Sequence, residues 1–168
     1  GNLGEPIVAR DTLKIFRYFR EHNLTMWLSM NTNGGAKSAE WWKDLAGVIN
    51  KKGAVIFSVD GLRDTNHLYR QGVNWDNVER NMQAFINAGG RARWDFLIFE
   101  HNQHQVSEAK QRADDMGFAE FSTLVSSRFR LNTGEAISVD SYKKKVNAPS
   151  REKVEQTQDK QFNLKASD

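Results

Sequence analysis

The sequence contains no cysteine among its 168 residues. This absence excludes disulfide bonds and thiolate zinc sites, and it excludes any iron–sulfur cluster held by this chain alone. Long apolar runs are also missing, because no stretch approaches the roughly 20 residues that a membrane-spanning helix requires. The N-terminus lacks the basic and then apolar segments of a secretory signal. We therefore expect a cytoplasmic protein that does not act in a membrane.

Charge of one sign is not in large excess either. The chain has 24 basic and 21 acidic residues, and its formal net charge at pH 7 is +3. One compact basic run occurs, Lys143–Lys145, and mixed charges follow it, so a solvated surface is its simplest interpretation. The charge pattern therefore gives no strong signal for a nucleic-acid partner. Hydrophobic residues make up 39% of the chain and aromatic residues 11%, which suits a globular domain with a buried core.

The apolar residues change their spacing repeatedly along the chain. Spacings of three residues predict a helix over 11–22, with Lys14, Arg17 and Arg20 on its outer face. Alternation of apolar and other side chains then predicts a strand over 24–30. Short apolar runs predict further strands at 54–59, 92–99 and 118–125. Helical spacing predicts the intervening helices at 39–50, 75–88 and 106–116.

Strands that alternate with helices indicate βαβ units and a parallel sheet, so the expected fold class is α/β. Ser38 and Asn74 are the expected N-caps of two of the helices. The helix over 11–22 implies one more strand just before it, of which Leu3 and its neighbours would be only the end.

Apolar side chains become sparse beyond about residue 130. We therefore expect a core over 1–130 and a polar tail, or the start of a further extension, over 131–168. Within that tail the sequence predicts one short element near 136–139.

Four polar segments follow the apolar runs or the inferred first strand. They are Gly1–Pro6, Asn31–Gly34, Ser58–Gly61 and Glu100–His104. Ligands gather at the carboxyl ends of strands in parallel α/β folds, so these segments are where we expect function. Each segment alone is also typical of a turn.

Three motifs in these segments resemble the radical SAM superfamily. Gly-x-x-Gly-Glu-Pro opens a helix, Thr-Asn-Gly follows the next strand, and Phe-Ser-Val-Asp-Gly-Leu follows the one after that. Segments 64–70, 72–75 and 95–105 are similar to the group of that superfamily whose members often carry a SPASM or twitch extension. The resemblance covers about residues 1–128. It implies a partial (β/α) barrel of parallel strands with outer helices, whose first strand is missing.

The resemblance implies a site for S-adenosylmethionine (AdoMet) in the first two segments. In the family, backbone oxygens of the Gly-Glu-Pro turn hold the amino group of AdoMet, which assigns Gly4, Glu5 and Pro6 to that role. An ammonium group needs converging acceptors, and glycine permits a close approach of the backbone. Thr32 and Asn33 would lie beside the same ligand.

Four further binding residues follow from the same resemblance. Ser58 and Asp60 match the segment that meets the carboxylate and the ribose of AdoMet. Arg70 offers a cation for the methionine carboxylate, and a surface salt bridge is an equally good interpretation of it. Asn102 matches a position near the ribose and the adenine. No catalytic residue is assigned.

The chain departs from the family at the iron–sulfur cluster. In the family, three cysteines in a Cys-x-x-x-Cys-x-x-Cys motif hold a [4Fe-4S] cluster, whose electron cleaves AdoMet to a 5′-deoxyadenosyl radical that abstracts hydrogen from a substrate. This chain has no cysteine, so we expect it to be inactive alone and to be a truncated piece. The resemblance implies AdoMet and the cluster as cofactors of the full enzyme. It also implies an electron donor such as flavodoxin or ferredoxin, and a small-molecule or peptide substrate.

Two other functions remain open from the residues alone. A metal site with oxygen and nitrogen ligands could draw on Glu100, His101, His104 and His67, although adjacent side chains of an extended segment point in opposite directions. Alternatively, a degenerate barrel could act as a non-catalytic nucleotide or small-molecule binding module. Five tryptophans could then stack on bases, but their spacing favours core packing or rim contacts.

Two further features of the sequence, Ser58 and the pair Arg93 and Asp95, do not identify a catalytic site. Ser58 lies in no Gly-x-Ser-x-Gly context, so a serine nucleophile is not predicted. Arg93 and Asp95 share one face of their strand, and they either point into a barrel or form a structural ion pair.

Overall fold

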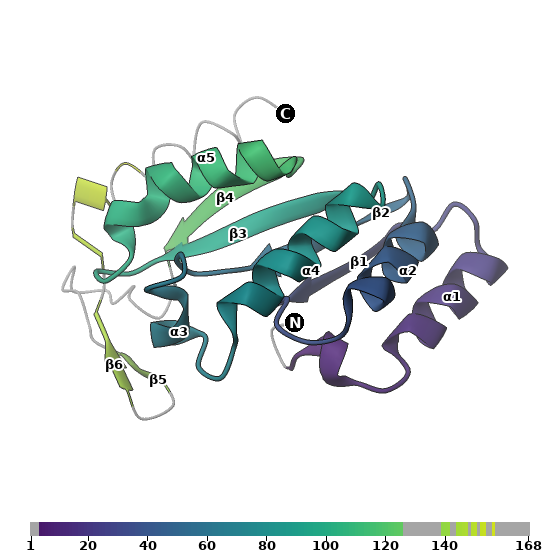
Figure 1. The fold of residues 1–168 in the computed structure, drawn as a ribbon, viewed down its shortest axis with the longest axis horizontal. Helices are drawn as coiled ribbons and strands as arrows, with labels where there is room; N and C mark the ends of the chain where they lie inside the picture. Colours follow the sequence, from purple (N-terminus) through teal and green to yellow (C-terminus); the bar gives the residue numbers. More distant parts are fainter. Residues whose placement is uncertain are drawn as a thin grey trace, which may run out of the picture.

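A four-stranded parallel sheet forms the centre of the protein (Figure 1). The computed structural model describes residues 4–125, 139–141, 144–147, 149–150, 152–153 and 156. The strands lie side by side in chain order: β1 (Leu28–Thr32), β2 (Gly53–Ser58), β3 (Ala92–Ile98) and β4 (Glu120–Val125). Each adjacent pair is parallel. The predicted α/β class and parallel sheet are therefore confirmed.

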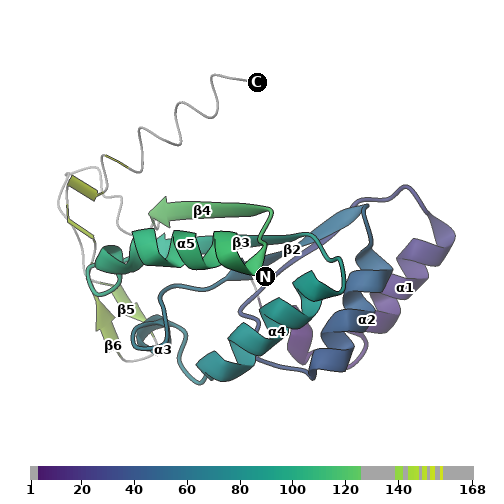
Figure 2. The same ribbon diagram turned by 45° about the horizontal axis from the view of Figure 1, so that its top comes forward.

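Helices connect the strands and pack on one face of the sheet. They are α1 (Thr12–His22), α2 (Ala39–Ile49), α3 (Asn66–Tyr69), α4 (Trp75–Asn87) and α5 (Val106–Met116), with the short 3₁₀ turns η1 (Pro6–Val8) and η2 (Gln103–Gln105). Figures 1 and 2 show α2, α4 and α5 over the same side of the strands. A separate antiparallel pair joins β5 (Val139–Ser141) to β6 (Lys144–Val146).

Sequential strand order with helices on one face is the arrangement of a (β/α) barrel segment. A doubly wound sheet would reverse its strand order and place helices on both faces. Here each crossover leads to the next strand along, and the described helices stay on one side. The four strands therefore form an arc of a barrel, and the face without helices corresponds to the barrel's interior.

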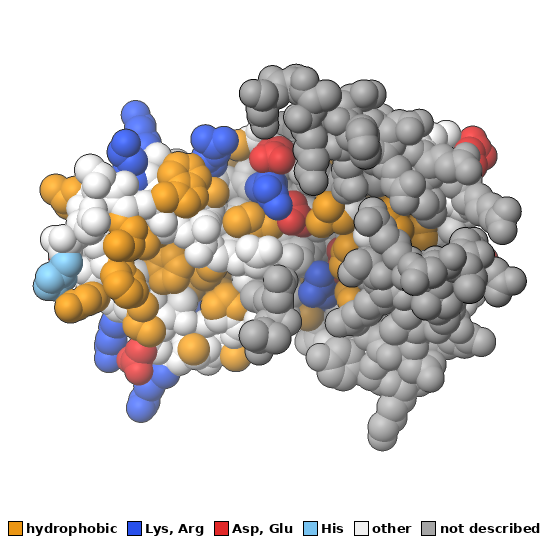
Figure 3. Space-filling view, turned by 180° about the vertical axis from the view of Figure 1, so that it is seen from behind, with side chains coloured by type: hydrophobic (Ala, Val, Ile, Leu, Met, Phe, Trp, Pro, Cys, Tyr) orange, Lys and Arg blue, Asp and Glu red, His pale blue; other side chains and the backbone are white. Residues whose placement is uncertain are grey.

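The two faces of the sheet carry different side chains. Met30, Phe57 and Trp94 are buried against the helices. Because side chains alternate along a strand, their neighbours in sequence point to the face that the described helices leave uncovered. That uncovered face carries Ser29, Asn31, Ile56, Ser58, Arg93, Asp95 and Leu97. In Figure 3, the coloured part of this face shows apolar side chains beside basic and acidic ones.

Aromatic side chains fill the core between the helices and the sheet. Trp42, Phe57 and Phe85 contact one another with ring centroids 5.3 to 6.2 Å apart. The indole N–H of Trp42 donates to the Ala36 carbonyl, and that of Trp94 donates to the Val59 carbonyl. Both indoles are thus buried with their polar atom satisfied, which confirms core packing for these tryptophans.

The first strand begins later than the alternation predicts. It starts at Leu28, whereas the sequence indicated a strand over 24–30. The Asn23 side chain accepts hydrogen bonds from the N–H groups of Thr25 and Met26 and so closes a turn there. Leu24 is consequently 73% exposed, and its place in the apolar alternation has no structural meaning.

Arg20 corrects the expected orientation of α1. The sequence placed it on the outer face of the helix, but only 8% of it is exposed. Its guanidinium donates to five backbone carbonyls, those of Leu24, Met26, Val48, Ile49 and Lys52. Such a fork of donors satisfies the carbonyls where α2 ends and where the chain enters β1 and β2.

The predicted helix caps are confirmed. The Ser38 hydroxyl accepts from the Trp41 N–H, and the Asn74 side chain accepts from the Asn77 N–H. In the tail, residues 136–138 of the predicted short element lie outside the described residues, and β5 begins at Val139. Two lysines of the basic run, Lys144 and Lys145, belong to β6. Within the described part of the chain, no helix is long and apolar enough to cross a membrane.

Candidate functional site

A first polar cluster lies where β1 ends. The Glu5 carboxylate accepts the Thr32 hydroxyl through Oε1 at 2.6 Å and the Asn33 N–H through Oε2 at 2.7 Å. The Thr32 hydroxyl oxygen also accepts from the Gly34 N–H at 3.1 Å. Glu5 therefore clamps the opening turn of the chain onto the Thr-Asn-Gly loop. The structure brings together the residues that the sequence assigned to the amino-group side of AdoMet.

Gly34 and Asn81 fix the shape of this loop. Gly34 has a φ of +71°, a backbone conformation that favours glycine. Asn81 of α4 is fully buried, and its side-chain amide donates to the carbonyls of Gly34 and Ala36 at 2.8 and 3.1 Å. Sequence reasoning missed Asn81, because nothing local links a polar residue in the middle of a helix to a loop 47 residues away.

The carbonyls of the Gly-Glu-Pro turn differ in their availability. The Pro6 carbonyl accepts both the Ala9 N–H and the Thr12 hydroxyl. The Glu5 carbonyl accepts the Val8 N–H and keeps one lone pair. Among the described residues, no group donates to the carbonyl of Gly4, which is exposed. Gly4 therefore presents the most accessible acceptor of the turn.

A second polar cluster joins the ends of β2 and β3. Asp60 is fully buried. Its Oδ2 pairs with the Arg70 Nε at 2.6 Å, and its Oδ1 accepts the Leu97 N–H at 2.7 Å. Burial raises the pKa of the Asp60 carboxyl, while the Arg70 cation and the Leu97 N–H oppose that rise. Arg70 is thus the counter-ion of a buried carboxylate, and not a partner in a surface salt bridge.

Asn102 completes the second cluster. Its amide donates to the carbonyls of Asp60 and Leu97, both at 2.9 Å, and its oxygen accepts the Phe99 N–H at 2.7 Å. Asn102 is fully buried. The polar side-chain atoms of Asp60 and Asn102 are therefore used within the protein. This arrangement suits residues that position the loops around a ligand.

Ser58 lies between the two clusters. It is half-buried at the end of β2, on the uncovered face, and opposite Asp95 in the parallel register. Asp95 forms a two-pronged ion pair with Arg93, with N–O distances of 2.6 and 2.8 Å. Both interpretations of Arg93 and Asp95 therefore hold, because they share the uncovered face and pair with each other there. The ion pair raises the pKa of Arg93.

Gln105 is a further residue that the sequence did not reveal. Its side-chain oxygen accepts the Thr65 hydroxyl and the Leu62 N–H, and its amide donates to Asp64 at 2.7 Å. These contacts tie the loop after β2 to the start of α5. The pairing spans about 40 residues of sequence and has no local signature.

The histidines after β3 do not assemble a metal centre in the part of the chain that the structure describes. There, no group of three or more His, Asp or Glu side chains is close enough to share an ion. The His101 ring stacks on Phe99 with centroids 5.3 Å apart. Burial lowers the pKa of His101, and the nearby Glu100 carboxylate opposes this effect. The metal alternative therefore gains no support from the described residues.

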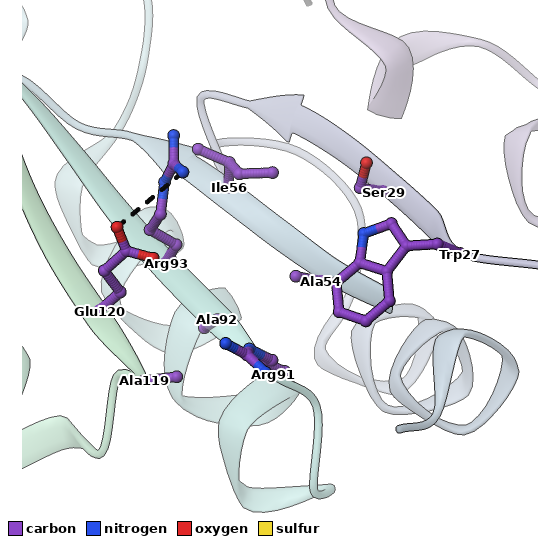
Figure 4. Close-up of a pocket in the computed structure, with 9 residues that line it drawn as sticks. All are labelled: Trp27, Ser29, Ala54, Ile56, Arg91, Ala92, Arg93, Ala119 and Glu120. Atoms are coloured by element: carbon purple, nitrogen blue, oxygen red, sulfur yellow. Dashed lines mark ion pairs between the residues drawn. The ribbon is translucent and has the colours of Figure 1, made fainter. Parts of the chain in front are cut away.

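A hollow of about 280 Å³ lies on the uncovered face near the amino ends of the strands, at the end of the sheet opposite to the two polar clusters (Figure 4). Its floor carries Ala54, Ala92 and Ala119, each at or next to the amino end of a strand. Trp27 and Arg91 border it from the residues just before β1 and β3. No motif in the sequence indicated this hollow, because it depends on which amino ends the sheet aligns.

No family model and no curated protein matches the sequence. Solved structures do match the fold. SuiB from Streptococcus suis has a TM-score of 0.60 and 17% identity, covering 82% of this chain and 31% of its own. SuiB bound to precursor peptide SuiA has a TM-score of 0.61 and 18% identity, covering 75% and 28%. The structure anSMEcpe with bound AdoMet has a TM-score of 0.57 and 18% identity, covering 73% and 34%.

Structures of both SuiB and anSMEcpe have been solved with bound S-adenosylmethionine. At such identities the likeness concerns the fold, and it confirms the expected partial barrel. The chain spans about a third of the length of the structures that it matches.

Proposed function

We propose that this chain is the AdoMet-binding part of a radical SAM enzyme. The observation that carries the proposal is the clamp made by Glu5. It holds the opening turn against the end of β1 and leaves the Gly4 carbonyl accessible. The same fold occurs in anSMEcpe, whose structure contains bound AdoMet.

The amino group of AdoMet would bind at this turn. Its ammonium can donate to the Gly4 carbonyl and to the remaining lone pair of the Glu5 carbonyl. The Glu5 carboxylate lies behind the turn and adds negative potential that favours a cation. Thr32 and Asn33 hold that carboxylate in place, so they position the ligand indirectly.

The carboxylate of AdoMet would bind near Arg70. Asp60 occupies the Nε of Arg70, and among the described residues no carboxylate pairs with its two terminal nitrogens. Those nitrogens remain available for a fork-shaped contact with a ligand carboxylate. Ser58, on the uncovered face, would offer a hydroxyl to the ribose or the carboxylate. Asn102 and Asp60 would fix the loops behind them.

The residues present do not fit a [4Fe-4S] cluster. The chain has no cysteine, and its described part assembles no metal-binding group. Reductive cleavage of AdoMet, with its electron donor, would therefore require ligands that these 168 residues do not contain. We expect the chain alone to bind AdoMet without turning it over.

A peptide is the substrate class that we propose for the complete enzyme. SuiB has been solved bound to precursor peptide SuiA, and anSMEcpe with bound AdoMet and Cp18Cys peptide. The uncovered face of the sheet is where we propose that such a peptide would lie, over the side chains coloured in Figure 3.

Calorimetric titration with AdoMet tests the proposal. The chain should bind AdoMet, and Glu5→Gln should weaken binding about tenfold, because the amide loses one charge-assisted acceptor. Glu21→Gln, which changes an exposed acid on α1, is the matched control and should bind like the parent chain. No heat at millimolar AdoMet would contradict the proposal. Equal affinity for adenosine would favour the nucleotide-binding module instead.

A further inference from the structure

The hollow at the amino ends of the strands lies away from the proposed AdoMet site. The AdoMet residues lie at the carboxyl ends of β1, β2 and β3 or in the opening turn that Glu5 holds against the end of β1. The hollow is lined by residues near the amino ends of β1 to β4. The two sites therefore occupy opposite ends of the uncovered face, and an inference about the hollow does not depend on AdoMet binding.

An exposed indole forms one wall of the hollow. Trp27 is 55% exposed, whereas Trp42, Trp75 and Trp94 are buried. Figure 4 shows its ring beside the floor, next to Ala54. A large apolar ring that borders a hollow offers a flat surface on which another ring can stack.

Arg91 supplies a cation at the same hollow. Its guanidinium lies 6.0 Å from the centroid of the Trp27 ring. Within the described residues, Arg91 has no carboxylate at salt-bridge distance. Arg93, the other arginine of the hollow, is held by Asp95 and lies 4.0 Å from Glu120. Arg91 is therefore the cation that remains available to a bound anion.

The floor and the rim restrict the shape and charge of a ligand. The small side chain of Ala54 leaves a low floor over which a thin, planar group fits, and Ala92 adds no bulk there because its side chain belongs to the core beneath the helices. A volume of about 280 Å³ is at the lower end of small-molecule sites, which suits a ligand of one or two rings. Glu120 at the rim has a half-exposed side chain and repels a second negative charge.

We propose that this hollow binds a planar aromatic monocarboxylate. The aromatic ring would lie against Trp27 over the alanine floor, and the carboxylate would pair with the guanidinium of Arg91. Glu120 would disfavour phosphates and other multiply charged anions. The group bound could be a free metabolite or the aromatic C-terminal residue of a peptide, since both present the same chemistry.

A titration of the isotope-labelled chain with 2-naphthoate, followed by NMR, tests the inference. The Trp27 indole signal and the amides of Ala54, Ala92 and Ala119 should shift together at ligand concentrations below about 10 mM. Neutral 2-naphthamide should bind at least about tenfold more weakly, because it cannot pair with a guanidinium. Inorganic phosphate should leave these signals unchanged. A C-terminal Phe dipeptide that binds more tightly than 2-naphthoate would identify a peptide end as the source.

Three variants complete the test. Arg91→Met keeps the aliphatic stem and should weaken 2-naphthoate binding about tenfold, and Trp27→Leu should weaken it several-fold. Arg10→Met, at an exposed arginine outside the hollow, is the control and should leave the affinity unchanged. Failure of 2-naphthoate to bind, or equal binding by Arg91→Met, would overturn the inference. Neither result would bear on the AdoMet titration, which concerns the other end of the strands.

Discussion

Single side chains hold distant segments of this protein together, and Arg20 makes more backbone hydrogen bonds than any other side chain described. Its guanidinium satisfies five carbonyls that would otherwise lie at helix and loop ends with few donors. We predict that Arg20→Met lowers the free energy of unfolding by about 3 kcal/mol, because several buried carbonyls lose a charged donor. Urea unfolding at pH 7, followed by tryptophan fluorescence, measures the difference.

Arg17→Met is the matched control for this prediction. Arg17 lies three residues earlier on α1 and forms a half-exposed ion pair with Asp44 at 3.2 Å. Exposed pairs of this kind contribute less than about 1 kcal/mol. Equal losses in the two variants would contradict the role assigned to Arg20.

The ion pair between Asp60 and Arg70 makes stability depend on pH in a defined direction. Burial raises the folded-state pKa of Asp60 above that of an exposed aspartate. The protonated Asp60 carboxyl therefore contributes fully to the free energy of unfolding below about pH 4. That contribution is lost as the pH rises through the raised folded-state pKa of Asp60. Arg70 opposes that loss by pairing with the carboxylate. Arg70→Met should thus unfold like the parent chain near pH 4 but be about 3 kcal/mol less stable at pH 8.

Urea unfolding at the two pH values checks this difference. Arg63→Met serves as the control, because Arg63 pairs with Asp76 where both side chains are about two-thirds exposed. Its effect should stay below about 1 kcal/mol at both pH values. A deficit of Arg70→Met that is the same at pH 4 and pH 8 would show that the charge of Asp60 is not what Arg70 stabilises.

At the scale of elements, close approach of β1 and β2 depends on a glycine. A Cβ at Gly53 would overlap the Leu28 carbonyl of the neighbouring strand, whereas a Cβ at Gly47 on α2 would meet no atom within 4 Å. Gly53→Ala should therefore lower the free energy of unfolding by about 2 kcal/mol through steric overlap. Gly47→Ala should raise it by about 0.5 to 1 kcal/mol, because alanine favours a helix.

Thermal unfolding of both variants provides the measurement. The opposite signs make each variant the control of the other, since both replace glycine by alanine within seven positions. A fall in melting temperature for Gly47→Ala, or none for Gly53→Ala, would contradict the packing of these two elements.

The elements were predictable wherever local chemistry defines them. Ser38 and Asn74 cap their helices as their positions indicate, because a cap depends only on neighbouring N–H groups. The start of β1 and the burial of Arg20 were not predictable. The burial of Arg20 depends on carbonyls that other elements bring together, whereas the pattern alone indicates a solvent-facing charge on a helix. The start of β1 was missed for another reason, because the turn at Asn23 interrupts an apolar alternation that is still typical of a strand.

At the scale of the whole molecule, the described helices cover one face of the sheet and leave the other to the interior side, as in an arc of a barrel. The motifs predicted the location of the carboxyl-end clusters, because the ends of successive parallel strands lie together. They did not predict that Asp60 and Asn102 use their side chains inside the protein. The hollow beside Trp27 was also beyond the sequence, since its residues share no motif and meet only through strand register.

We propose above all that AdoMet binds at the carboxyl ends of the strands. NMR mapping of AdoMet contacts on the isotope-labelled chain tests it most directly. We expect the amides of Gly4, Asn33 and Gly34 to shift on titration, while those of Ala54 and Ala119 at the opposite end of the strands stay unchanged. Shifts confined to the hollow, or none at millimolar AdoMet, would contradict it.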